Sequence, residues 1–203
     1  MISRLSLLIL IVGFSACTNS NKENTTAETP KEDKSVTPEG VIIEAQTEVD
    51  TLKGSLKAYA VSQIGDTHFT INYYSPATRG RMIWGGLVAY DNVWVTGAHK
   101  ATSIEFDEDI RMGETVIAAG KYAFFTIPGK DQWTIILNKN WDQHLTDDYN
   151  EAEDVVRLQV TPEVNESHQE RLRYVINAND DRAGKIVMSW DRLEVSVPFE
   201  VIK

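Results

Sequence analysis

The chain of 203 residues has a single cysteine, Cys17, and its longest apolar stretch, Leu5–Phe14, has only ten residues. One cysteine cannot form an intramolecular disulfide, so the folded part has to be stable through its core alone. Ten apolar residues are about half of the roughly 20 that a membrane-spanning helix needs, which argues against a permanent transmembrane anchor.

Basic residues are also scarce, with 20 lysines and arginines against 30 aspartates and glutamates and a net charge of −10. An acidic chain is repelled by the phosphates of nucleic acids and by anionic lipid headgroups. We therefore expect no nucleic-acid partner and no electrostatic docking on a membrane.

The sequence patterns of common catalytic sites are missing: there is no Gly-x-Ser-x-Gly, no His-Glu-x-x-His and no phosphate-binding glycine loop. The four histidines, His68, His99, His144 and His168, are too far apart in sequence to form a local pair of zinc ligands. We therefore expect no cofactor and no metal, assign no catalytic residue, and favour a protein that is not an enzyme.

The first residues have the layout of a secretory signal, with Arg4, the apolar stretch and then small residues. Gly13-Phe14-Ser15-Ala16-Cys17 resembles a bacterial lipoprotein lipobox, although Phe14 stands where a leucine is usual. The resemblance implies cleavage of residues 1–16 and acylation of Cys17. The alternative is ordinary cleavage that leaves a free thiol.

This reading predicts a protein of the cell envelope, attached to the membrane through its lipid anchor, at the outer membrane facing the periplasm or at the cell surface. Several acyl chains would hold it stably, because each buried CH₂ contributes about 0.8 kcal/mol. Removing residues 1–16 takes away one base and no acid, which changes the net charge from −10 to −11.

Residues 17–39 contain the anchor cysteine and a polar segment whose only apolar side chains are Ala27 and Val36. Such a segment cannot bury enough surface to offset the entropy of ordering, so it is predicted to be a flexible linker. Residues 40–53 are expected to be a lead-in that pairs partly with the domain, with an extra strand as the alternative. Residues 54–203 have the usual size of one domain.

Apolar residues alternate with polar ones along most of residues 54–203, which is typical of half-buried strands. The clearest case has Leu193, Val195, Val197, Phe199 and Val201 on one face, with Pro198 on the other suggesting a sheet edge. The run 122–127 is apolar on both faces and predicts a central strand. Only residues 147–154 suggest a helical turn.

About nine short strands joined by tight turns predict an all-β fold, an antiparallel β-sandwich of jelly-roll or Greek-key type. A closed barrel is the main alternative.

Residues 74–102 form a long connection between predicted strands, and binding sites concentrate on such loops. Arg79 and Arg81 could hold a carboxylate or phosphate, and Trp84 or Trp94 could stack on a sugar. The alternative is that the tryptophans cap the core and the arginines pair with carboxylates of this acidic chain.

A second polar cluster runs from Trp141 to Tyr149. Asp142 with His144 could form an acid–base pair, and Asp147 with Asp148 could bind a hard cation. The alternative is a solvated loop between strands.

Several motifs, in order, resemble the bacterial family called domain of unknown function 2911. They are Gly80-Arg81, Gly85-Gly86-Leu87-Val88, Trp94-x-Thr96-Gly97-Ala98, Ala101-Thr102, Gly120-Lys121-Tyr122, 125–129, Trp133, Asn138-Lys139 and Trp141-Asp142. The resemblance covers nearly all of the domain after residue 54. It implies an exported, often lipid-anchored envelope protein and brings no established activity.

The chain departs from this family's pattern at Val95, His99 and Lys100, where the resemblance leads us to expect arginine, asparagine and glutamate. A site that depends on those polar groups would bind something different here, or nothing. Gly97 and Gly120 also have a structural explanation, as backbone positions with positive φ.

The candidate ligand-binding residues are Arg81, Trp94, Thr96, His99, Thr102 and Trp141. The favoured function is a non-enzymatic binding or assembly module for a saccharide, another small ligand or an envelope protein. The alternatives are a hydrolase of envelope or imported polymers, using Asp142, His144 or His99, and a purely structural part. A sandwich fold serves all three functions.

Replacing Cys17 with serine removes the expected acylation site. We expect C17S to leave the membrane fraction for the soluble fraction, because the lipid is the predicted means of attachment. Cell fractionation measures this, and unchanged fractionation of C17S contradicts the lipoprotein prediction.

Overall fold

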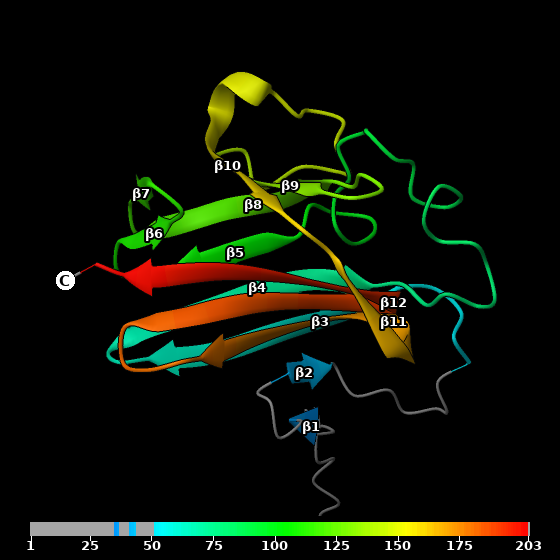
Figure 1. Ribbon diagram of the computed structural model, residues 1–203, viewed down its shortest axis with the longest axis horizontal. Coiled ribbons are helices and arrows are strands. Elements are labelled where there is room, and N and C mark those ends of the chain that lie inside the picture. Colours follow the sequence, from blue (N-terminus) through cyan, green and yellow to red (C-terminus); the bar gives the residue numbers. More distant parts are fainter. Residues whose placement is uncertain (1–34, 37–40, 44–50, 203) are drawn as a thin grey trace, which may run out of the picture. The chain divides into compact units, whose positions relative to one another are not determined.

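Two antiparallel β-sheets pack face to face in the computed structural model, which describes residues 35–36, 41–43 and 51–202 (Figure 1). The predicted β-sandwich is confirmed. The predictions for the signal peptide, for Cys17 and for most of the linker concern residues outside the described ranges. All described residues belong to one unit, Glu32–Lys203.

Counting the described residues, the larger sheet has eight strands. In spatial order they are β1 (Ser35–Val36), β2 (Val41–Ile43), β3 (Leu56–Ile64), β4 (Thr67–Ser75), β5 (Ser103–Phe106), β8 (Gly120–Ile127), β9 (Trp133–Asn138) and β10 (Asp154–Val160). The smaller sheet has the order β11 (Glu163–Ala178), β12 (Ala183–Val201), β6 (Ile110–Met112) and β7 (Thr115–Ile117). The domain after residue 54 thus has ten strands, β3–β12.

Helical structure in the described residues is limited to a 3₁₀ turn, η1 (Glu151–Glu153), within the segment predicted to form one turn. Asn150 caps it by accepting a hydrogen bond from the Ala152 N–H at 3.1 Å. In the described ranges, no helix has the length and apolarity needed to cross a bilayer.

Within the segment 40–53, strand β2 pairs with β3 at Ala58–Ala60. β1 in turn pairs with β2, although Ser35 and Val36 belong to the segment predicted to be a flexible linker.

Strand β12 folds back on itself at Asp191, which has a φ of +55°. The Val201 N–H donates to the Arg182 carbonyl at 2.6 Å, and the Ser189 hydroxyl donates to Glu194 at 3.3 Å. Residues 183–190 and 193–201 are therefore the two arms of a hairpin, and they run in opposite directions in Figure 1.

The second arm is not an edge strand, because β6 pairs with it at Glu200 and Val201. Pro198 is exposed and lies beyond these two pairs, so its missing N–H disturbs no described ladder bond. Along this arm, Val195, Val197, Phe199 and Val201 are buried as the alternation predicts.

Strand β8 is covered on both faces, which confirms its prediction as a central strand. Phe124 belongs to the main core between the sheets. Ala123 and Phe125 point the other way, into a second core that Val95 and Tyr149 help to cover. The connections containing Val95 and Tyr149 thus pack on the outer face of the larger sheet.

Four of the five tryptophans pack together: Trp133 and Trp190 are buried in the core, and Trp84 and Trp94 pack against it. Trp94 stacks on Trp190 with ring centroids 5.8 Å apart and an interplanar angle of 16°. Trp84 meets Trp133 edge to face at 4.9 Å. Trp84 and Trp94 are partly buried, and they pack against the core from the long 76–102 connection.

Truncating Trp94 should destabilise the fold. We expect Trp94→Ala to lower the free energy of unfolding by about 3 kcal/mol, because it removes ring contacts and leaves a cavity. Trp94→Phe should cost less. The control is Trp141→Ala, which truncates an exposed tryptophan. Urea denaturation of the full chain measures all three, and equal costs for Trp94→Ala and Trp141→Ala would contradict the core assignment.

Candidate functional site

The long 76–102 connection is anchored at its start to β11. The Thr78 hydroxyl and the Arg79 N–H donate to the two carboxylate oxygens of Glu170, at 2.6 and 2.8 Å. Arg81 folds back and donates to the carbonyls of Thr78 and Ala77, at 3.0 and 2.6 Å. The Arg81 guanidinium thus holds its own loop and pairs with backbone carbonyls rather than with a carboxylate.

Thr96 is the centre of a buried hydrogen-bonded cluster. Its hydroxyl donates to the Thr126 hydroxyl at 3.0 Å, and its carbonyl accepts from the hydroxyls of Thr102 and Tyr174, at 2.9 and 2.8 Å. All four side chains are fully buried. Thr96 has a φ of +51°, which a β-branched residue adopts only under strain. These contacts hold the strained turn on the sheet.

Gly97 is needed here for space rather than for its φ. A Cβ at this position would come within 2.7 Å of the Thr102 hydroxyl oxygen, and φ is not positive. The expectation of a positive φ is therefore wrong for Gly97. It is right for Gly120, whose φ is +155°.

The segment after Gly97 joins the second polar cluster. His99 has a φ of +62°, its ring meets Tyr74 edge to face at 5.0 Å, and its carbonyl accepts from the Leu145 N–H at 2.8 Å. The backbones of Lys100 and His144 form an isolated antiparallel β-bridge. The two connections therefore support each other over the outer face of the larger sheet.

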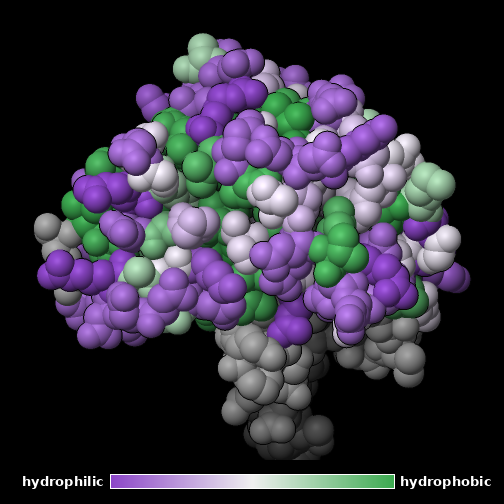
Figure 2. Space-filling model, viewed as in Figure 1, coloured by the Kyte–Doolittle hydropathy of each residue, from purple (hydrophilic) through white to green (hydrophobic). Residues whose placement is uncertain are grey.

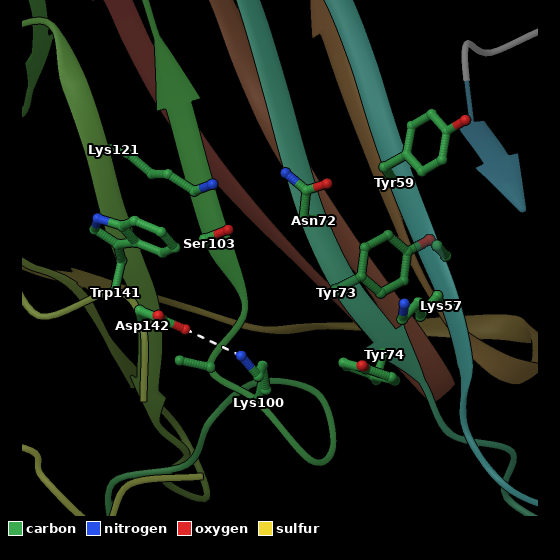
Figure 3. Close-up of a pocket in the computed structure, with 12 residues that line it drawn as sticks. Lys57, Tyr59, Asn72, Tyr73, Tyr74, Lys100, Ser103, Lys121, Trp141 and Asp142 are labelled. Atoms are coloured by element: carbon green, nitrogen blue, oxygen red, sulfur yellow. Dashed lines mark hydrogen bonds and ion pairs between the residues drawn. The ribbon is translucent and has the colours of Figure 1, made fainter. Parts of the chain in front are cut away.

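Where these connections end, a groove of about 300 Å³ lies on the outer face of the larger sheet (Figure 3). The side chains of Tyr59 on β3, Asn72 on β4 and Ser103 on β5 are neighbours across the paired strands and form its floor. In Figure 3, Trp141 and Lys121 lie on one side of the groove and Lys57 lies on the other.

Trp141 is the only exposed residue among the five tryptophans, all of which lie in the described part of the chain, with 39% of its surface accessible. The Lys121 ammonium lies 4.1 Å from the centre of its ring, within the range of a cation–π contact. This contact holds the Trp141 ring in place beside the groove while leaving part of it open to solvent.

The groove carries positive charge on an otherwise acidic protein. Lys57, Lys100 and Lys121 line it together with one acid, Asp142. Lys100 pairs with Asp142 at 3.1 Å, and Lys121 approaches Glu105 at 3.7 Å. Figure 2 shows that hydrophilic side chains cover most of the face seen in that view.

The structure does not bring the six candidate residues around one cavity. Trp141 lines the groove, and His99 lies next to two of its lining residues, Tyr74 and Lys100. Thr96 and Thr102 meet each other in the buried cluster, Trp94 lies in the tryptophan core, and Arg81 binds its own loop.

The second polar cluster is arranged differently from the proposed acid–base pair. Asp142 pairs with Lys100, whereas His144 pairs with Asp147 at 2.8 Å. The described residues contain no group of three metal-ligating side chains placed to hold a metal ion. Asp142 and His144 are each engaged with another partner.

Sequence reasoning did not select Lys57, Tyr59, Asn72, Lys100 or Lys121. Alternation places Lys57 and Tyr59 on the outward face of β3, and Asn72 on the outward face of β4. The alternation of inward and outward residues could therefore have been read from the sequence. That these faces lie beside β8 and Trp141 depends on the pairing of β4 with β5 and of β5 with β8 across the long connection.

The chain thus has an all-β domain with a groove on the outer face of its larger sheet. The family described as "Protein of unknown function (DUF2911)" matches residues 55–199. The chain belongs to this family. Comparison with curated proteins and with solved structures found no match.

The Glu170 anchor should make stability depend on pH. Hydrogen bonds from the Thr78 hydroxyl, the Arg79 N–H and His168 lower the Glu170 pKa to about 2, below its ordinary value of 4.5. The contribution of Glu170 to the free energy of unfolding is therefore complete above about pH 4.5 and is lost as the pH falls towards 2.

We expect Glu170→Gln to reduce the loss of unfolding free energy between pH 4.5 and pH 2. Denaturation at several pH values measures it. The control is Glu114→Gln, which removes the same charge from an exposed turn. An identical pH dependence in wild type and Glu170→Gln would contradict the role of Glu170.

Proposed function

We propose that this protein is a non-enzymatic binding module of the cell envelope, held at a membrane through an acylated Cys17, and that the groove on the outer face of the larger sheet binds its ligand. The observation that carries this proposal is the exposed Trp141, fixed by Lys121 at the border of a polar groove. Exposed aromatic side chains at concave sites supply contact area at a low cost in conformational entropy.

Support also comes from the rigidity of the groove. Its floor consists of paired strands, and its wall at Lys100 is held by the Thr96 cluster and by the ion pair with Asp142. A ligand that enters such a preformed site does not have to order a loop, which lowers the entropic cost of binding. Envelope location and lipid attachment rest on the lipobox-like sequence before Cys17.

A hydrolase of envelope or imported polymers is the alternative function. Asp142 and His144 were its candidate acid–base groups, and each is paired with another side chain. No observation favours this alternative over a binding module.

A thermal-shift screen of the full-length protein in detergent tests the proposal. The panel contains neutral and acidic sugars, peptidoglycan fragments and divalent cations. A ligand at about 100 times its Kd adds about 2.7 kcal/mol, which raises the Tm by about 5–10 °C. We expect a shift in wild type that Trp141→Ala reduces.

The control is Leu87→Ala, which truncates another exposed apolar side chain that does not line the groove. It should keep the full shift. The proposal fails if no compound shifts the Tm, or if Trp141→Ala shifts as much as wild type.

A further inference from the structure

The charges that line the groove are distributed along its length. Lys57 lies on β3 and Lys121 on β8, and two further strands, β4 and β5, lie between them. Adjacent strands are about 4.8 Å apart, so strands β3 and β8 are about 14 Å apart. The register places Lys121 across from Val61 rather than from Lys57, so the two lysine backbones are further apart than the strands themselves. Two lysines this far apart do not both bind a single phosphate or carboxylate. It suits a ligand that carries several negative charges along its length.

The lysines differ in how far the protein neutralises them. Lys100 has Asp142 at 3.1 Å, and Lys121 has Glu105 at 3.7 Å. Among the described residues, no carboxylate lies within 4.0 Å of the Lys57 ammonium. At the Lys57 end of the groove, an anionic group of a ligand therefore gains the most favourable electrostatic interaction.

Between the charges, the groove offers the groups that recognise sugars. Asn72 can both donate to and accept from hydroxyl groups, and Ser103 adds a hydroxyl of its own. Tyr59 and the exposed part of Trp141 offer aromatic surface at opposite sides. Aromatic faces pack on the C–H groups of a sugar ring, while the polar floor binds its hydroxyls.

From this arrangement we infer that the groove binds an acidic oligosaccharide, with carboxylates directed at Lys57 and Lys121 and a sugar ring packed against Trp141. The inference rests on the proposed function, because it names the ligand class of the same groove. A neutral sugar would not form an ion pair with Lys57, and a compact anion would not reach from β3 to β8.

Isothermal titration calorimetry on the full-length protein in a neutral detergent tests the inference. The probes are the trisaccharides of galacturonic, glucuronic and mannuronic acid, each beside its methyl ester, which keeps the rings and removes the charges. We expect at least one acid to bind about fivefold or more tighter than its ester, since an exposed charge pair contributes up to about fivefold in affinity. The difference should shrink at high salt.

Variants assign the contacts. Lys57→Gln should weaken binding of the acid about two- to fivefold and leave the ester unchanged. Trp141→Ala should weaken both by about fivefold or more, because it removes the aromatic contact that they share. The control Lys130→Gln changes an exposed lysine in the turn between β8 and β9 and should have no effect.

Equal affinity for acid and ester, with both weakened by Trp141→Ala, would overturn the acidic ligand class and leave groove binding intact. Absence of binding by all three acids would also overturn it, while the wider thermal-shift panel still decides the proposed function. Binding of an acid that neither Lys57→Gln nor Trp141→Ala weakens would overturn the assignment to this groove.

Discussion

The hydrogen-bonded cluster around Thr96 is the constraint on which the outer face of the sandwich depends. The chain leaves β4 at Ser75 and returns as β5 only at Ser103, so a long connection has to be held somewhere. Thr96 holds it with a strained backbone and with bonds to Thr126, Thr102 and Tyr174 in the interior. A buried polar network of this kind stabilises only one arrangement, because each unmet partner would cost the full desolvation of a polar group.

This arrangement divides the outer face of the larger sheet into two parts. Over β8 and β9 the connections cover an apolar cluster that includes Phe125 and Ile136. Over β3, β4 and β5 the face stays open, and its outward residues are polar or aromatic: Tyr59, Asn72 and Ser103. The groove lies at the border between the covered and the open parts. Lys100 and Trp141 lie where the covering connections end.

The five tryptophans show how one residue type serves two purposes in this fold. Trp84, Trp94, Trp133 and Trp190 contact one another and help to fill the core. Trp141 instead lies against Lys121 with much of its surface exposed. The difference follows from position in the chain: the strand tryptophans point between the sheets, and the connection that carries Trp84 and Trp94 turns them inward, whereas Trp141 follows the end of β9.

The sequence by itself determined most of the longer strands, the two-sided burial of β8, the single helical turn and the family, because period-two alternation and ordered motifs are local properties of the chain. It did not reveal the short strands β5, β6 and β7. The pairing of β5 with β8, the fold-back of β12 at Asp191 and the burial of Thr96 and Thr102 depend on contacts between distant segments. The same holds for the groove, since Lys57 and Trp141 come together only through strand register. Local patterns indicate which face a residue occupies, and only tertiary structure decides what lies beside it.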